Sequence, residues 1–100
     1  MIKHYVMFRM KETPDKEENT RKLKVLLESL KEKIPQVLHL EVGINRGKSG
    51  NAADLLLYTE MADMAALEIY QNHPEHVGVV AFVNQVCAER RVVDYEADEA

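Results

Sequence analysis

The stretch that decides the fold is the opening one, IKHYVMFRM over residues 2–10. Its even positions share one side of an extended chain: Ile2, His4, Val6, Phe8 and Met10. Its odd positions share the other side: Lys3, Tyr5, Met7 and Arg9. Because successive side chains of a β-strand point to opposite faces, this alternation predicts a strand with one buried face. The second face is also partly apolar, which is unusual for a face left to water.

The period changes after Met10, and a helix is expected. Thr13 is a suitable N-cap, Pro14 suits the first helical position, and acidic residues follow in the first turn. One apolar stripe then recurs at helical spacing: Leu23, Leu26, Leu27, Leu30 and Ile34. The helix should run to about Lys33, because Pro35 ends it.

Two further strands are predicted on either side of a polar loop. Val37–Ile44 places Leu38, Leu40, Val42 and Ile44 on one face. Residues 45–51 contain two glycines and no large apolar side chain, which is typical of a flexible loop. Asp54–Met61 contains three consecutive leucines, Leu55–Leu57, so both of its faces carry apolar groups. The two strands are expected to form a hairpin with a long loop.

The last part of the chain predicts a broken helix and a final strand. A short helix spans Met64–Asn72, His73-Pro74 interrupts it, and a second helix runs to about Cys87. The inward side of that second helix is expected to be Val77, Val80, Ala81 and Val86. Arg90–Tyr95 is the final strand, and the acidic residues from about 96 to 100 are expected to fray.

The order β-α-β-β-α-β indicates one α+β domain over residues 1–100, with a ferredoxin-like four-stranded antiparallel sheet. Both helices should then cover one face. Tyr5, Met7, one side of Leu55–Leu57 and one of Val92 and Val93 lie on the other face, where an apolar surface needs a cover. A second copy packed sheet to sheet is the simplest cover, so a twofold homodimer is expected.

Composition and charge exclude several classes of protein. The net charge is −4, with 17 acidic and 13 basic residues, whereas a nucleic-acid binder usually has a basic excess. No apolar run approaches the length of a membrane span, and the opening residues lack a signal-peptide layout. The single cysteine, Cys87, fits a reducing compartment and is interpreted as a small buried hydrophobe in a helical stretch. A cytoplasmic protein without nucleic-acid or membrane partners is expected.

Five segments of the chain are distinctive when taken together. They are the opening residues 2–9, the Ile34-Pro35-Gln36-Val37 step, residues 40–45, the block Tyr70-Gln71-Asn72-His73-Pro74-Glu75-His76 and the ending Val93-Asp94-Tyr95-Glu96. With them the sequence resembles the stress-responsive A/B barrel (Dabb) family over nearly the whole chain, from about Ile2 to Glu96. The resemblance implies a dimeric α/β barrel. In the plant olivetolic acid cyclase branch, a cofactor-free polyketide cyclase, the catalytic tyrosine and histidine match Tyr70 and His76. A further pocket histidine of that branch matches His4.

The residues themselves leave two interpretations of this block open. His76 falls in the first turn of the last helix, where the positive helix end disfavours imidazolium and keeps a general base neutral. Tyr70, a few residues away across the bend, could orient a carbonyl while His76 takes a carbon-bound proton. Alternatively, the two side chains hydrogen-bond each other or the backbone and hold the bend together.

The other two histidines are also ambiguous. His4 lies on the buried strand face, where it is either a structural histidine satisfied by one hydrogen bond or a polar group lining a ligand pocket. His73 precedes a proline and is expected to cap or turn the chain, with ligand binding as the alternative. A metal site is not expected, because His73-x-x-His76 supplies at most two ligands and zinc needs three or four. The loop Gly47-Lys48-Ser49-Gly50 lacks the glycine spacing of a phosphate loop.

Two functions follow as alternatives, neither with a cofactor. The first is a homodimer that binds a small organic ligand in a pocket between sheet and helices. The second is a cofactor-free enzyme acting on a carbonyl-rich small molecule, with His76 as base, Tyr70 as orienting acid and His4 as pocket partner. A cofactor-free monooxygenase is a third interpretation that no residue pattern supports specifically, and the lack of tryptophan argues against haem degradation.

Overall fold

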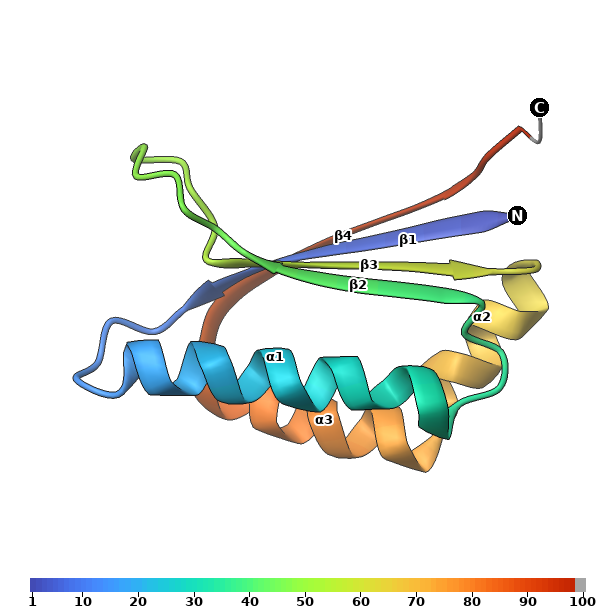
Figure 1. Cartoon of the computed structure of the whole chain (residues 1–100), viewed down its shortest axis with the longest axis horizontal. Helices are drawn as coiled ribbons and strands as arrows, with labels where there is room; N and C mark the ends of the chain where they lie inside the picture. Colours follow the sequence, from blue (N-terminus) through green and yellow to red (C-terminus); the bar gives the residue numbers. More distant parts are fainter. Residues whose placement is uncertain (99–100) are drawn as a thin grey trace.

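The computed structural model describes residues 1–98 and contains four strands and three helices. In chain order they are β1 (Ile2–Met10), α1 (Lys16–Lys33), β2 (His39–Ile44), β3 (Leu55–Met61), α2 (Met64–Asn72), α3 (Pro74–Val86) and β4 (Cys87–Glu96). The strands form one sheet in the order β2-β3-β1-β4, and every neighbouring pair is antiparallel. All three helices lie on the same side of that sheet (Figure 1). The predicted ferredoxin-like α+β fold is confirmed.

Strand β1 sits inside the sheet and sets the register of its two neighbours. Val6 lies opposite Leu57 of β3 and Val92 of β4, so these three side chains point to the same face. The even positions of β1 are all buried beneath the helices, as the alternation predicted. Burial of such apolar side chains stabilises the fold by about 1.5–3 kcal/mol each.

Helix α1 buries its predicted leucine stripe, but it begins later than expected. Its N-cap is Asp15, whose side chain makes no capping bond, and Thr13 instead belongs to a preceding turn. In that turn the Thr13 carbonyl accepts a hydrogen bond from the Lys16 N–H at 3.1 Å. The predicted Thr13 cap is therefore wrong, because residues 13–15 reverse the chain from the end of β1 to the helix layer.

Strand β2 is also shorter than predicted. Val37 is buried and its N–H bonds to the carbonyl of Ile34, which continues the turn after α1. Leu38 is exposed and does not share a covered face with Leu40 and Val42. The strand begins at His39, where pairing with Glu60 of β3 starts.

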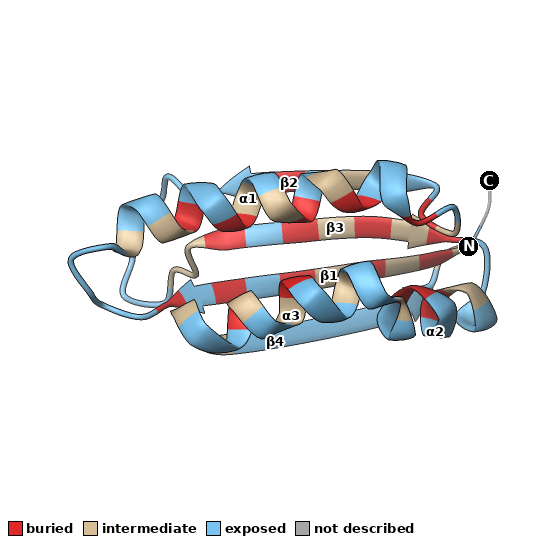
Figure 2. Ribbon diagram, turned by 90° about the horizontal axis from the view of Figure 1, so that it is seen from below, coloured by how far each residue is buried: buried red, intermediate tan, exposed pale blue. Residues whose placement is uncertain are grey.

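The inward side of α3 matches the prediction only in part: Val80 and Val86 are half-buried, and Val86 packs against the core. Val79 and Val83, one turn apart, are the buried residues, whereas Val77 and Ala81 are exposed. A helix that carries valine on most of its sides offers more than one apolar stripe, so periodicity alone could not choose between them. The choice follows from the start of the helix at Pro74 and from its packing beside α1 (Figure 2).

Residues at both ends of β4 were also assigned incorrectly. Cys87 opens the strand instead of ending a helix; it is half-buried, and its Sγ lies 3.7 Å from the Met10 Sδ. At the other end Glu96 stays in the strand and pairs with the Met1 amine, and the Ala97 N–H donates to the Met1 carbonyl. Fraying is therefore wrong for residues 96 and 97, while the last two residues of the predicted tail lie outside the described range.

The sheet has one covered and one uncovered face. β1 and β3 alternate along their length between buried and more exposed residues, while β4 is exposed along most of its length (Figure 2). We define the open face as the sheet side away from the helices. Its exposed or half-buried apolar and aromatic residues are Tyr5, Met7, Leu56, Tyr58, Val93 and Tyr95. Its three tyrosines stack across the strands, with Tyr5 between Tyr58 and Tyr95 at centroid distances of 4.6 and 6.0 Å.

Candidate functional site

A cavity of about 210 Å³ lies on the helix-covered side of the sheet. Its walls are α3 and the facing residues of β1 and β4, with one residue each from α1, α2 and β3. Eight lining residues are apolar: Val6, Phe8, Leu27, Leu57, Val79, Val80, Val83 and Val92. Four are polar: His4, Gln71, His76 and Arg90. Apolar walls with a few polar groups are the usual composition of small-ligand sites, although this cavity is smaller than the roughly 300–1,000 Å³ of drug-sized pockets.

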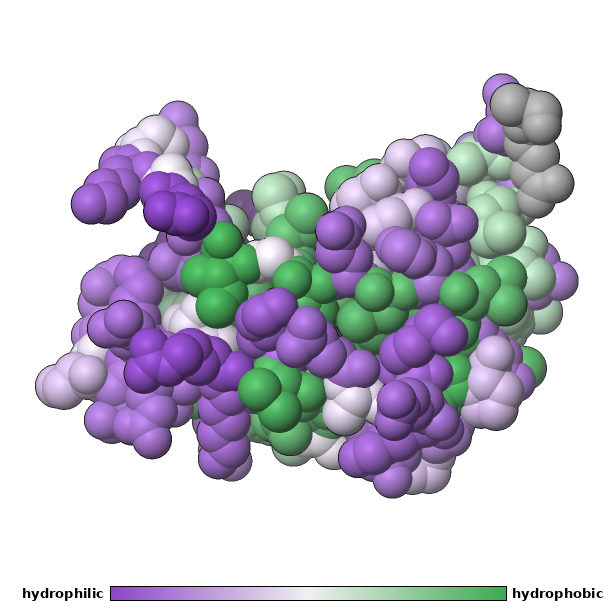
Figure 3. All heavy atoms as spheres, in the orientation of Figure 1, coloured by the Kyte–Doolittle hydropathy of each residue, from purple (hydrophilic) through white to green (hydrophobic). Residues whose placement is uncertain are grey.

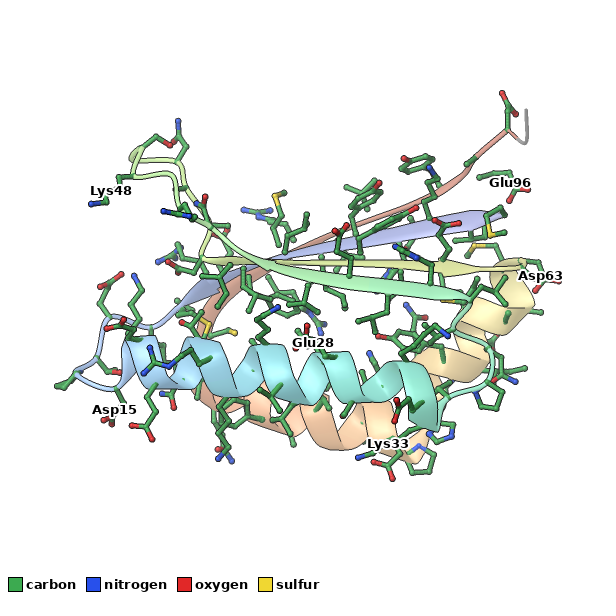
Figure 4. All side chains as sticks on the ribbon, in the orientation of Figure 1. Asp15, Glu28, Lys33, Lys48, Asp63 and Glu96 are labelled. Atoms are coloured by element: carbon green, nitrogen blue, oxygen red, sulfur yellow. The ribbon has the colours of Figure 1, made fainter. Side chains whose placement is uncertain are left out.

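The exposure of the lining residues indicates where the cavity opens. His4, Val6 and Phe8 of β1 are buried, with His4 only 4% exposed, so β1 forms the floor. Val92 of β4 is 45% exposed and Arg90 is also exposed. Because β4 is an edge strand, the mouth of the cavity lies along this edge. Figure 4 shows side chains filling much of the remaining space between sheet and helices.

His4 is held from the neighbouring strand by an aspartate. The β1–β4 register places Asp94 directly opposite His4, and the two side chains form a hydrogen bond through His4 Nδ1. A carboxylate accepts, so Nδ1 carries the proton and the orientation of the ring is fixed. His4 therefore has the satisfied hydrogen bond expected of a structural histidine, and it also lines the cavity.

The ring of Tyr70 lies next to the rings of both His4 and His76. Tyr70 is completely buried, and its ring centroid is 4.5 Å from that of His76 and 5.9 Å from that of His4. Its hydroxyl has no hydrogen-bond partner among residues 1–98. Burial raises the pKa of Tyr70, so the hydroxyl stays protonated. A buried donor without an acceptor is rare, since the missing bond costs about 1–3 kcal/mol.

His76 is a neutral imidazole with an assignable tautomer. Its Nδ1 lies 3.0 Å from the backbone carbonyl of Gln71. A carbonyl can only accept, so Nδ1 is the donor and Nε2 keeps its lone pair. Burial lowers the pKa of His76, the Gln71 carbonyl partly opposes this, and the nearby His4 and Arg90 add to the lowering. The free lone pair makes Nε2 a potential base at neutral pH.

The structure therefore brings together three of the four residues singled out in the sequence: His4, Tyr70 and His76. The bond from His76 to the Gln71 carbonyl spans the bend between α2 and α3, as the structural interpretation of this block anticipated. Tyr70 and His76 do not hydrogen-bond each other within the described residues.

His73 is placed elsewhere. Its ring accepts a hydrogen bond from the Glu75 N–H at 3.1 Å and so caps α3, as the sequence predicted. His73 is not among the residues that line the cavity beside His76. Its position thus supports the capping role and gives no support to the ligand-binding alternative.

Sequence reasoning missed Arg90 as a cavity residue and Asp94 as the partner of His4. Both lie on the helix-facing side of β4, at the same strand parity as Val92. The β1–β4 register would have identified them, because it pairs Asp94 with His4 and Arg90 with Phe8. The parity was visible in the sequence, but the register was not.

The part of the chain that the structure describes contains neither a cluster of metal ligands nor a membrane-spanning helix. No three His, Cys, Asp or Glu side chains gather closely enough there to hold a metal ion. None of the three helices combines the length and the apolar character needed to cross a bilayer.

A sequence profile of the stress-responsive A/B barrel domain (Dabb) matches residues 2–97. Among solved structures, a dimeric ferredoxin-like protein of unknown function from Bacteroides fragilis is 30% identical, with a TM-score of 0.87 over 96% of this chain and 95% of its own. A Dabb family protein from Mesorhizobium loti is 23% identical, with a TM-score of 0.81 over 98% of this chain and 97% of its own.

A hydroxynitrile lyase from Passiflora edulis is only 14% identical, yet it superposes with a TM-score of 0.86 over 99% of this chain and 94% of its own. A likeness at this level of identity shows a shared fold alone. No curated protein matches the sequence.

Proposed function

This chain belongs to the stress-responsive A/B barrel family, and on that premise we propose that it is a homodimer that binds a small organic ligand between sheet and helices. The observation that carries the ligand-binding part is the cavity itself, which has apolar walls and four polar groups. Its position over β1 and under α3 keeps the ligand site within one chain.

The homodimer is supported by the open face. Met7 is 46% exposed there, and Leu56, Val93 and Tyr95 are exposed beside it. A hollow of about 420 Å³ lies on the same face beneath the raised β2–β3 hairpin, bounded partly by Met7, Ile44 and Leu56. Figure 3 shows apolar residues at its floor. A second copy would cover this surface, and the related protein from Bacteroides fragilis is described as dimeric.

Cofactor-free proton transfer is the second candidate, and the His76–Tyr70 geometry favours it. His76 Nε2 has a free lone pair, and the ring of Tyr70, whose hydroxyl is an unused donor within the described residues, lies 4.5 Å from the His76 ring. On a carbonyl compound that reaches both groups, His76 would take a proton from the carbon next to the carbonyl. Tyr70 would donate a hydrogen bond to the resulting enolate oxygen, the kind of stabilisation that lowers such barriers.

Filling the cavity tests ligand binding. Val80 lines the cavity and is only half-buried, so Val80→Phe adds bulk there without disturbing the deep core. Val25→Phe, on the exposed side of α1, is the matched control. We expect extracts of the purified wild-type and Val25→Phe proteins to contain a discrete small molecule that Val80→Phe lacks. Identical extracts from all three proteins would contradict cavity binding.

Hydrogen–deuterium exchange on a small dicarbonyl compound tests proton transfer. In deuterated buffer, the wild-type protein should accelerate exchange at the central carbon of ethyl acetoacetate, as followed by NMR. His76→Gln should reduce the rate to background while the protein stays folded. Equal exchange with the wild type and His76→Gln would reject His76 as the base.

A further inference from the structure

The cavity has an asymmetric charge pattern. Of its lining residues only His4, His76 and Arg90 are ionisable. His4 donates its Nδ1 proton to Asp94, whose carboxylate is not among the lining residues, and burial lowers the pKa of His76, so that the His76 ring is neutral at pH 7. Among the lining residues Arg90 is therefore the one with a permanent positive charge, because a guanidinium stays protonated.

Arg90 differs from the arginines around it. Its sequence neighbours Glu89 and Arg91 point to the opposite face, where Glu89 pairs with both Arg9 and Arg91. Arg90, on the cavity side, forms no ion pair within residues 1–98, and Asp94 on the same side is engaged by His4. Strand β4 thus pairs its charged side chains on the open face, while on the cavity side the Arg90 guanidinium has no ion-pair partner within the described residues.

The position of Arg90 specifies how a ligand would lie. Arg90 and Val92 stand at the exposed β4 edge, whereas Val6 and Phe8 form a buried apolar floor. A ligand with one anionic end and an apolar body would place the anion at the mouth and the body inside. At about 30 Å³ per water molecule, the volume corresponds to about seven waters and suits a short chain or a single ring.

We propose that the cavity selects small apolar organic acids and that Arg90 is the specificity-determining residue that binds their carboxylate; this rests on the ligand-binding function proposed above. A guanidinium binds a carboxylate through two parallel hydrogen bonds. A monoanion matches the single unpaired guanidinium, whereas a phosphate dianion would leave a second charge unmatched. The same pattern disfavours cationic ligands.

Matched ligands and variants test the selectivity. Isothermal titration of the wild-type protein with hexanoate, hexanamide and hexylammonium keeps the apolar body constant while the charge changes. Arg90→Gln removes the guanidinium at an exposed position, so the fold should be retained. Arg46→Gln, in the β2–β3 loop, is the control, because Arg46 is also exposed and does not line the cavity.

We expect the wild-type protein to prefer hexanoate to hexanamide by about tenfold or more, the range of a charge-assisted hydrogen bond. Arg90→Gln should abolish this preference and Arg46→Gln should keep it, while high salt should weaken it in the wild-type protein. Two outcomes would overturn the role of Arg90 and leave the cavity function standing. One is equal binding of hexanoate and hexanamide to the wild-type protein, and the other is an Arg90→Gln protein that keeps the preference for hexanoate. If neither ligand binds, or if Val80→Phe binds both as the wild type does, the cavity function and this inference both fail.

Discussion

The two faces of one sheet contrast more sharply than any other two regions of this molecule. Leu56 and Leu57 are adjacent and identical in type, yet Leu57 is 2% exposed under the helices and Leu56 is 39% exposed on the open face. Both faces of β1 and β3 carry apolar side chains, but the chain supplies helices for only one of them. Whether an apolar side chain of this sheet is buried depends on whether another element covers its face. The composition of the face alone does not tell which face is covered.

The same contrast separates the proposed roles. The covered face contains the cavity and the group formed by His4, Tyr70 and His76, all from one chain. The open face contains stacked tyrosines, exposed apolar residues and paired charges, which suit contact with a second copy. Ligand binding and assembly can therefore be disturbed independently.

The largest effect is expected from truncating the two adjacent leucines. Leu57→Ala should lower the free energy of unfolding by about 3 kcal/mol, because it removes buried apolar atoms and enlarges the cavity that Leu57 lines. Leu56→Ala should cost under about 1 kcal/mol within one chain, and its effect on the melting temperature should depend on protein concentration through the dimer. Thermal unfolding at several concentrations checks both. Equal, concentration-independent losses would remove the distinction between the faces.

A charge on the open face should affect assembly more than folding. Met7→Asp would place an unpaired carboxylate in the proposed interface and should raise the dimer dissociation constant roughly a hundredfold or more. Val25→Asp makes the same change on the exposed side of α1 and should leave the dimer intact. Sedimentation equilibrium measures both. A Met7→Asp protein that dimerises as tightly as the wild type would show that this face is not the interface.

On the covered face, His76 should make stability depend on pH. Its pKa in the folded protein is lowered from about 6.5, mainly by burial, so the unfolded chain binds more protons in that range. The free energy of unfolding should therefore rise with pH through this window. The contribution of His76 should be lost progressively as the pH falls below about 6.5. His76→Asn should flatten the dependence measured by denaturant unfolding. Parallel curves for the two proteins would exclude this linkage.

The smallest effect is expected at His73, three residues away on the outer side of the same bend. His73→Ala removes the side-chain cap of α3 and should cost about 1 kcal/mol, while His73→Asn, a good capping residue, should restore most of it. Neither variant should change ligand binding. A loss of hexanoate binding in both variants, with their stability intact, would reinstate His73 as a ligand contact.

The fold was predictable because its signals are local. The alternation of β1, the leucine stripe ended by Pro35 and the His73-Pro74 break each act within a few residues, and together they specify the element order. The inward side of α3 was not predictable, because valines at several helical angles fit equally well until the helix is docked. The start of α1 was missed because Thr13 and Pro14 fit a turn as well as a helix terminus.

The candidate site was predictable only in its local part. Tyr70 and His76 lie six positions apart across one bend, so their proximity followed from the sequence. The bond between His4 and Asp94 joins residues 90 positions apart, and it depends on a strand register that no short pattern encodes. Arg90 was missed for the same reason. Its strand parity shows which face of the sheet it is on, but its place beside the cavity depends on the neighbouring strands and helices.

Native mass spectrometry of the untagged protein as purified tests the contrast between the faces most directly, because it measures assembly and retained ligand together. We expect a species of twice 11.5 kDa, with an added small mass that Val80→Phe loses without losing the dimer. A monomer that does not associate on concentration would contradict this expectation, because the open face would then have no cover. A dimer whose added mass survives in Val80→Phe would place the ligand outside the cavity.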